Sequence, residues 1–295
     1  MAQATADEYL RGVTEEHRNC DKHGEYTSQV YRSFGFPQWS SCPLCVIENN
    51  LIKHEEWLRR EHLRWQVNAL EESGIPARYH GKTLTDFVPR SEKQRVALDV
   101  AREYLDTFDQ QLKAGRCLIF CGNVGTGKTH ITCAIARALV LAARSVRYAT
   151  VAGLIQLLRS TWRKGSEQSE MDLLRDLQSL ELLVLDEIGV QYGTEAETVQ
   201  LFEVLNRRYN AVRPTIVISN LDLEGLKVYL SERAVDRLRE NGGRLLVFDG
   251  ESHRGQAPME VPKKALRCPE DDDSRLSKPK VIALPGGGAH SAIDD

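Results

Sequence analysis

The 295-residue chain has no long apolar segment, since no stretch approaches the roughly 18–20 apolar residues that a membrane-spanning helix needs. It also lacks a basic region followed by an apolar one near its start, so no secretion signal is apparent. An excess of positive charge is missing as well. The net charge is −3 at pH 7, and contact with nucleic acid would have to come from a local basic surface. These absences predict a cytoplasmic protein without membrane contacts.

Cysteine is scarce, with seven residues in the whole chain. In a reducing compartment, closely spaced cysteines indicate metal binding or redox chemistry rather than disulfides. The remaining composition, 41% hydrophobic and 27% charged, is ordinary for a globular protein. The length allows one large domain, or a medium-sized domain with a small attachment.

Two short-spaced pairs of candidate metal ligands lie near the N-terminus: Cys20 with His23, and Cys42 with Cys45. Thiolate and imidazole groups at this spacing are typical of a tetrahedral Zn²⁺ site. Three cysteines and one histidine leave no position for water, so the predicted site is structural; a chance grouping of unpaired thiols is the alternative. We expect residues 1–47 to form a small zinc-binding module with little regular periodicity, in which metal substitutes for hydrophobic packing.

Residues 48–73 have the pattern of a helix that ends at the stop signals Gly74 and Pro76. Apolar side chains fall on one stripe of this helix: Leu51, Leu58, Trp65 and Ala69. The stripe either packs against the rest of the chain or docks on a partner protein. In both cases the helix links the N-terminal module to the remainder of the chain.

An α/β domain is predicted over residues 74–256. A helix is expected at about 91–113, and short apolar runs alternate with helical stretches at 117–120, 146–150, 182–186, 215–219 and 245–248. Five strands separated by helices predict a mostly parallel five-stranded sheet covered on both faces, a three-layer sandwich. Residues 257–295 combine an acidic run, prolines and a glycine triplet, which is typical of a disordered tail.

The sequence GNVGTGKT at residues 122–129 matches the phosphate-binding loop G-x-x-x-x-G-K-[ST] in full. It directly follows an apolar strand and begins a predicted helix, which is the context that the motif needs. In such a loop, backbone N–H groups surround the phosphates, Lys128 meets the β and γ oxygens, and Thr129 is a ligand of Mg²⁺. The chain is therefore predicted to bind a nucleoside triphosphate.

Polar side chains lie at the ends of the predicted strands at 182–186 and 215–219. Asp186 is expected beside Mg²⁺ at the carboxyl edge of the sheet, and Glu187 is expected to polarise the attacking water as general base. Asn220 follows the strand at 215–219, where its amide would contact the γ-phosphate or the water; an ordinary turn residue is the alternative. Together with the phosphate loop, these residues predict ATP hydrolysis.

Arginine is frequent in residues 230–255. Three arginines lie on a predicted helix, and a fourth follows the last strand: Arg233, Arg237, Arg239 and Arg254. They are either plain surface charges, or one of them reaches the ATP of a neighbouring subunit as a trans-acting finger. The second interpretation requires an oligomer.

The ordered segments ESGIPARYHGKTLTDF, GNVGTGKTH, LLVLDEIG, SNLD, ERAVDRL and FDGESHRG resemble the AAA+ ATPases that load the bacterial replicative helicase, the DnaC type. The resemblance covers about residues 72–255, and transposition helper ATPases of the IstB type share most of these motifs. It implies the P-loop AAA+ fold. It also implies that the nucleotide is bound by Gly122, Asn123, Val124, Gly125, Thr126, Gly127, Lys128, Thr129 and His130.

The resemblance implies roles for further residues. Asp186 and Glu187 become the Walker B pair, and Asn220 becomes the sensor 1 residue. Arg237 matches the arginine finger, with Arg233 as second candidate. Two positions match other family features: Arg254 the sensor 2 arginine, although the run DGESHR departs from the family pattern, and Tyr79 with Phe87 the entry segment near the adenine.

Residues 151–180 form a longer connection than a sheet crossover needs and resemble the extra helix of the initiator and loader branch of AAA+ proteins. In that branch the helix lines a channel for single-stranded DNA. Cationic and aromatic groups gather here, at Arg159, Trp162, Arg163 and Lys164. A solvated helix end with one packed tryptophan is the alternative. The short chain after residue 255 leaves no room for a full helical lid, which also fits this branch.

The resemblance thus implies an ATP-dependent loader of the replicative helicase onto single-stranded DNA during replication initiation. The implied partners are a DnaB-type hexamer, single-stranded DNA and further copies of the chain; the implied cofactors are ATP, Mg²⁺ and structural Zn²⁺. Two alternatives stay open: an IstB-type helper that remodels duplex DNA, and an adaptor whose zinc module binds a partner while ATP acts only as a switch. The Cys/His cluster departs from the small helical domain of the best-known loaders.

Overall fold

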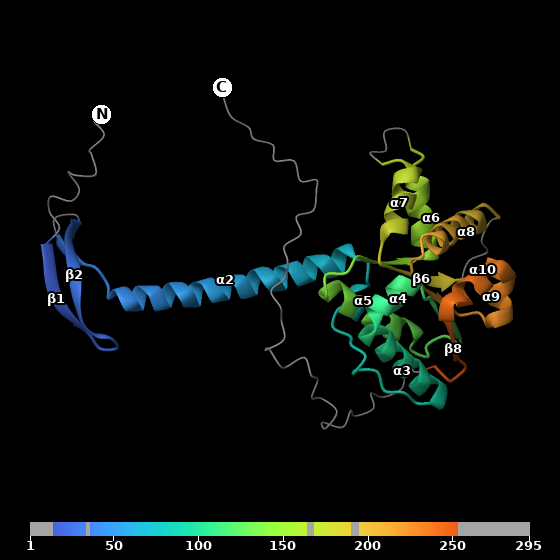
Figure 1. Cartoon of the computed structure of the whole chain (residues 1–295), viewed down its shortest axis with the longest axis horizontal. Helices are drawn as coiled ribbons and strands as arrows, with labels where there is room; N and C mark the ends of the chain where they lie inside the picture. Colours follow the sequence, from blue (N-terminus) through green and yellow to red (C-terminus); the bar gives the residue numbers. More distant parts are fainter. Residues whose placement is uncertain (1–13, 34–35, 164–167, 190–194, 253–295) are drawn as a thin grey trace.

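The computed structural model describes residues 14–33, 36–163, 168–189 and 195–252 (Figure 1). Lys164, Arg254 and the predicted tail at 257–295 lie outside these ranges. The prediction that a full helical lid is missing concerns the chain after residue 255, which also lies outside them. Within the described ranges, no helix combines the length and the apolar character that crossing a membrane requires.

A five-stranded parallel sheet forms the centre of the larger body, in the order β5-β6-β7-β4-β8. Its strands are β4 (Leu118–Gly122), β5 (Val146–Thr150), β6 (Leu182–Ile188), β7 (Thr215–Ser219) and β8 (Arg244–Phe248). Each strand begins within one residue of its predicted start. The predicted parallel sheet is confirmed.

Helices cover both faces of this sheet and give the predicted three layers (Figure 1). One face packs on α3 (Glu92–Asp106), α4 (Phe108–Ala114), α5 (Lys128–Leu141) and the end of α2. The other packs on α6 (Val151–Ser160), α7 (Glu170–Ser179), α8 (Glu195–Asn210), α9 (Leu223–Leu230) and α10 (Glu232–Arg239). Short 3-10 turns, η1 (Ala77–Tyr79) and η2 (Glu240–Gly242), complete the body. Because the strands are parallel, the segments after β4, β6 and β7 meet at one edge.

The single helix predicted at about 91–113 is wrong, because the chain forms two helices, α3 and α4, that meet at Thr107. Thr107 has φ −114° and ψ 23°, outside helical geometry. Tyr104 and Phe108, on either side of this break, nevertheless enter the same core. The apolar spacing therefore continues across the break and conceals it in the sequence.

A three-stranded antiparallel sheet precedes α2 and is formed by β1 (Thr14–Cys20), β2 (Gly24–Ser33) and β3 (Phe36–Trp39). Its strands are not apparent from the sequence, because β1 and β3 are exposed along almost their whole length and show no apolar alternation. The β1–β2 hairpin pairs Cys20 with Gly24, so Cys20 and His23 lie at its turn.

The helix predicted at 48–73 begins earlier, because α2 spans Pro43–Glu72. Proline at the first helical position lacks the N–H that would stay unpaired there, which explains the start. Its 30 residues correspond to about 45 Å at 1.5 Å per residue. In Figure 1, α2 extends away from the parallel sheet and carries the small sheet at its far end.

The apolar stripe on α2 is largely uncovered. Leu51, Leu58 and Trp65 are 57%, 49% and 41% exposed, whereas Ala69, close to the larger body, is half-buried. The interpretation of the stripe as a packing surface is therefore wrong for these three residues. Docking on a partner stays a prediction.

Candidate nucleotide site and Cys/His cluster

The phosphate-binding loop joins β4 to the N-terminus of α5. Lys128 is buried, and its Nζ donates to the carbonyl oxygens of Gly122 (2.8 Å) and Asn123 (2.6 Å). Gly122 has φ +111°, and a Cβ at this position would lie 2.3 Å from the carbonyl oxygen of Phe248. Only glycine fits such a turn. The loop thus places the N–H groups that begin α5 where phosphate oxygens are bound in this motif.

Asp186, near the end of β6, accepts hydrogen bonds on both carboxylate oxygens. Oδ2 accepts from Thr129 Oγ1 (3.0 Å) and from the Tyr148 hydroxyl (2.6 Å), and Oδ1 accepts from the backbone N–H of Glu187 (2.7 Å). The structure therefore brings the predicted pair Thr129 and Asp186 into direct contact. A hydroxyl and a carboxylate are ligands that suit Mg²⁺, so this donor set fits the predicted metal.

Sequence reasoning misses Tyr148. Its burial and the charge of Asp186 raise the pKa of the Tyr148 hydroxyl, which stays protonated and donates its hydrogen bond. In the register of β5 on β6, Thr150 lies opposite Asp186, so Tyr148 lies on the same sheet face two residues earlier. The pairing register of β5 with β6 is therefore the information from which the contact of Tyr148 with Asp186 can be predicted.

Glu187 is exposed and lines a cleft together with Arg159, Glu197 and Tyr229, between α6, α8 and α9. Its backbone φ is +62°, a value that side-chain-bearing residues rarely adopt. The strand register shifts between Leu185 and Ile188, next to this residue. The carboxylate of Glu187 thus follows Asp186, the predicted Mg²⁺ ligand, on an irregular stretch of backbone.

Asn220 follows β7 and is exposed at the edge of the sheet that carries the phosphate loop. The carbonyl oxygen of Leu221 accepts from the N–H of Gly122 at 3.0 Å. Ser219 Oγ donates to the carbonyl oxygen of Ile188 at 2.7 Å. These contacts tie the ends of β4, β6 and β7 together, and they place Asn220 beside the loop.

The segment before α3 packs on the phosphate loop. Phe87 is buried, and a Cβ on Gly127 would lie 2.4 Å from its ring. The ring also meets His130 edge-on, with centroids 5.6 Å apart. Burial lowers the pKa of His130, whose Nε2 lies 3.1 Å from the carbonyl oxygen of Thr83. Of the two predicted adenine residues, Phe87 thus contacts the loop, and Tyr79 packs into the core beneath it.

Arg237 on α10 faces α8. Its guanidinium donates to Asn206 Oδ1 and lies over the rings of Tyr209 (5.0 Å) and Phe202 (5.9 Å). It also lines an open concave surface with Arg233 and Arg239. These contacts are with α8 and not with the phosphate loop of the same chain, which is compatible with action on a neighbouring subunit.

The candidate DNA contacts lie at the end of α6. Arg159 forms an ion pair with Glu197 (3.0 Å), and Trp162 Nε1 donates to Glu170 (2.7 Å). Trp162 and Arg163 are exposed, so the alternative of a packed tryptophan is wrong. An exposed ring and a guanidinium lie side by side in the sequence here.

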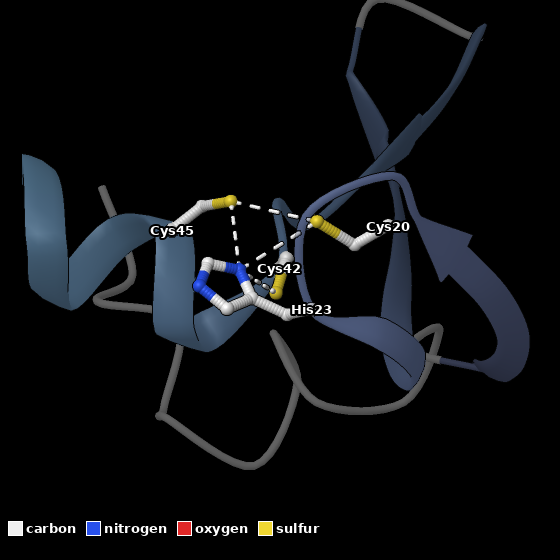
Figure 2. Close-up of side chains that lie close together, drawn as sticks. All are labelled: Cys20, His23, Cys42 and Cys45. Carbon is white, nitrogen blue, oxygen red and sulfur yellow. Dashed lines mark hydrogen bonds between the residues drawn. The ribbon is translucent and has the colours of Figure 1, made fainter.

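The four predicted zinc ligands converge at the start of α2 (Figure 2). His23 Nδ1 lies 3.7 Å from Cys20 Sγ, 3.7 Å from Cys42 Sγ and 3.3 Å from Cys45 Sγ. The sulfurs of Cys20 and Cys45 are 3.5 Å apart. Zn–S and Zn–N bonds of about 2.0–2.3 Å in a tetrahedron place ligand atoms about 3.3–3.8 Å apart, so the cluster fits zinc.

The surroundings of the cluster favour metal ligation. The backbone N–H groups of Lys22 and His23 lower the pKa of Cys20 to about 6, which makes a thiolate available at neutral pH. His23 Nε2 lies 3.1 Å from Glu48 Oε1, and the other Glu48 oxygen contacts Lys22. A carboxylate on Nε2 leaves Nδ1 free for the metal, as in many zinc sites.

A parallel sheet in this order, a phosphate loop after β4 and an acidic pair after the apolar run of β6 define a P-loop ATP-binding protein of the AAA+ class. The model of the family described as IstB-like ATP binding protein matches residues 48–258, well over half of the chain. The chain belongs to this family.

Curated relatives include proteins named replicative helicase loader DnaC. The one from Escherichia coli (strain K12) is 34% identical over 200 residues, which is 68% of this chain and 80% of that protein. The one from Buchnera aphidicola subsp. Acyrthosiphon pisum (strain APS) is 32% identical over 207 residues, 70% of this chain and 83% of that protein. The predicted resemblance to DnaC-type loaders is confirmed.

Solved structures confirm the fold. The crystal structure of the DnaC helicase loader aligns with a TM-score of 0.52 and 24% identity, and covers 59% of this chain and 100% of that one. The replication initiator DnaA bound to AMPPCP and single-stranded DNA aligns with a TM-score of 0.50 and 25% identity, and covers 60% of this chain and 51% of that one.

Proposed function

We propose that this chain is an ATPase that loads the replicative helicase onto single-stranded DNA at the start of replication. The contact of Thr129 with Asp186 beside the buried Lys128 carries the proposal, because it joins both halves of an ATP-hydrolysis site. The relatives named replicative helicase loader support helicase loading as the process that this ATPase serves. Loading of a bacterial replicative helicase would assign the chain to the bacterial cytoplasm.

Each part of the proposed ATP hydrolysis is assigned to particular residues. Lys128 and the N–H groups of residues 122–129 hold the phosphates, while Thr129 and Asp186 would hold Mg²⁺. Mg²⁺ held there would neutralise negative charge on the phosphates. Glu187 accepts the proton of the attacking water, which Asn220 orients.

The arginines extend the site to a second subunit. Arg237, with Arg233 as second candidate, reaches the γ-phosphate of the neighbouring copy, so hydrolysis depends on self-association. Arg254, outside the described residues, is proposed as the sensor 2 arginine of its own site. Because the arginine of one copy completes the ATP site of the next, the rate of ATP hydrolysis should rise when copies of the chain assemble.

The N-terminal part is proposed to grip the helicase. Zn²⁺ held by Cys20, His23, Cys42 and Cys45 fixes the β1–β2 hairpin to the start of α2 and does no chemistry. The exposed stripe on α2 then supplies apolar surface to the DnaB-type hexamer. The proposed division is a zinc module at 1–47 that includes the start of α2, a linking segment at 48–73 formed by the rest of that helix, an ATPase domain at 74–256 and a tail at 257–295.

Single-stranded DNA is proposed to contact the end of α6. Exposed Trp162 offers a ring on which a base stacks, and Arg163 with Lys164 meets the phosphates. Arg159 contributes only if its ion pair with Glu197 opens. The DnaA structure with single-stranded DNA shares the fold of the body, which supports this choice of nucleic acid.

One experiment tests the main proposal. The purified chain, the replicative helicase hexamer of the same organism and closed circular single-stranded DNA are mixed with ATP and Mg²⁺, and DNA-bound helicase is counted. Loading should require the wild-type chain and fail with Lys128→Ala, which should also lose nucleotide binding. Glu187→Gln should bind ATP but not hydrolyse it.

Two outcomes would contradict the proposal. If the chain does not capture the helicase and forms tight filaments on duplex DNA, it is the IstB-type helper. If Glu187→Gln loads the helicase at the wild-type level, the chain is the adaptor that uses ATP only as a switch.

A further inference from the structure

Tyr148 touches the candidate metal site from a strand that carries none of its motifs. It is one of the buried residues of β5, and its hydroxyl donates to the Asp186 oxygen that also accepts from Thr129. Asp186 is 6% exposed, so these donors and not water determine how its carboxylate is oriented. Removal of the Tyr148 hydroxyl would leave Thr129 as the one described donor on Oδ2.

The backbone of the same residue is fastened to the end of α2. The N–H of Tyr148 donates to the carbonyl oxygen of Ser73 at 2.7 Å, directly after α2 ends. The next residue, Gly74, has φ +78°, and a Cβ there would lie 2.5 Å from the carbonyl oxygen of Tyr148. Both main-chain polar groups of Tyr148 therefore lie against the C-terminal end of the long helix.

One residue thus joins two distant parts of the chain. The main chain of Tyr148 is hydrogen-bonded to the residue directly after α2. Its side chain is a short, rigid connection to Asp186, since a tyrosine side chain has only two rotatable bonds that position the ring. A displacement of α2 at Ser73 and Gly74 has to move β5 at Tyr148 or break these contacts. Movement of β5 at Tyr148 would shift the hydroxyl that donates to Asp186 Oδ2.

We propose that Tyr148 is a positioning residue that holds the Asp186 carboxylate for Mg²⁺ and couples this carboxylate to the end of α2. The inference rests on the proposed ATPase function and adds its regulation: a partner that moves α2 changes the affinity of the site for Mg²⁺ and thereby for Mg-ATP. By thermodynamic linkage, Mg-ATP changes the affinity of α2 for that partner by the same factor.

The first test separates metal positioning from general stability. A fluorescent ATP analogue is bound to the full chain, first in EDTA and then over a Mg²⁺ titration. Tyr148→Phe keeps the ring and removes the donor. Its half-saturating Mg²⁺ concentration should rise about tenfold, because partners of metal ligands contribute on this scale, while binding in EDTA stays unchanged. A purely structural role would weaken both equally and overturns the proposal.

Tyr104→Phe is the matched control. Tyr104 is equally buried, and its hydroxyl donates to the carbonyl oxygen of Arg116 at 2.9 Å, away from the phosphate loop. Its removal should leave the Mg²⁺ dependence at the wild-type value. An equal shift in both variants would contradict a specific role of Tyr148.

The second test addresses the link to α2. Gly74→Ala adds a methyl group that has to displace the Tyr148 carbonyl and that strains a backbone with φ +78°, and it changes no residue of the phosphate loop. The half-saturating Mg²⁺ concentration should rise about threefold or more, within the range of measured couplings through packed residues. Gly81→Ala is the control, because a Cβ there meets nothing within 4 Å. An unchanged Mg²⁺ dependence in Gly74→Ala overturns the coupling.

A third measurement keeps this inference separate from the ATPase proposal. Unfolding of the variants Tyr148→Phe, Asp186→Ala and their combination in urea gives the interaction between the two side chains without any nucleotide. If wild-type protein shows no Mg²⁺-dependent nucleotide binding, the proposed ATPase function fails. If the combined variant loses stability as the plain sum of the single variants, the Tyr148–Asp186 contact itself fails.

Discussion

At the scale of single residues, Glu187 combines a functional side chain with an unfavourable backbone. Its φ of +62° lies in the left-handed region, which costs an L-residue roughly 1–2 kcal/mol. Its N–H nevertheless stays bonded to Asp186, and its carboxylate stays exposed. Such strain persists when the surrounding structure imposes it, and the neighbouring phosphate site supplies a reason to keep it.

Replacement of Glu187 by glycine or by alanine separates these two roles. Both changes remove the carboxylate, so both variants should lose ATP hydrolysis and keep nucleotide binding. Glycine has no αL penalty but a more flexible unfolded chain, so Glu187→Gly should be more stable than Glu187→Ala by about 0.5–1 kcal/mol. Urea unfolding measures the difference. If Glu187→Ala were instead the more stable variant by about 0.5–1 kcal/mol, the ordinary cost of glycine, the backbone would not be strained at this position.

Residues in contiguous motifs were predictable, and those that depend on strand register were not. Lys128, Thr129 and Asp186 follow from short sequence patterns with known spatial context, and the structure brings Thr129 and Asp186 into contact. Tyr148 looks like any aromatic residue of a buried strand. Its role appears only when β5 is paired with β6, which no local pattern specifies.

At the scale of elements, burial decides what a sequence reveals. The central strands β4, β6 and β7 are buried on both faces and read as apolar runs, and the starts of all five parallel strands were predicted within one residue. The strands β1 and β3 have no buried apolar face, and antiparallel pairing leaves no trace in their composition. The boundary between α3 and α4 was missed for a related reason, because the core contacts continue across Thr107.

The exposed apolar stripe on helix α2 predicts a binding surface for the helicase. Gln in place of both Leu51 and Leu58 removes the centre of the stripe without loss of a described packing contact, so the free energy of unfolding should change by less than about 0.5 kcal/mol. Affinity for the helicase should fall about tenfold or more, since central apolar residues dominate interfaces. Surface plasmon resonance with immobilised helicase gives the affinity.

The matched control lies on another face of the same helix. Ile52 and Leu63 are both 54% exposed but lie off the stripe, so their joint replacement by Gln should leave helicase affinity unchanged. Equal losses from both double variants would show that α2 binds without a preferred face. No loss from either would place the helicase contact elsewhere.

At the scale of the whole molecule, the chain has two bodies that differ in how much apolar surface they bury. The larger body has apolar cores on both faces of its sheet. The small N-terminal sheet is nearly all exposed, and among its described residues Ser28 is the buried one. Segments below about 40 residues seldom fold without a metal or a disulfide, so the Cys/His cluster has to supply what packing does not.

Zinc removal should therefore separate the two bodies. The purified chain should contain one zinc ion per molecule, and a zinc-selective chelator in excess Mg²⁺ should unfold residues 14–42 while α3 to β8 stay folded. Helicase binding should be lost and nucleotide binding retained, because the cluster lies at the start of α2 and the phosphate loop belongs to the larger body at the other end of that helix (Figure 1). Cys45→Ser should reproduce the effect without chelator, whereas Cys117→Ser, at a buried cysteine outside the cluster, should leave zinc content unchanged. Hydrogen exchange of the backbone amides locates the loss, and simultaneous exchange in β4 and β6 would show that zinc stabilises the whole chain and not its N-terminal sheet alone.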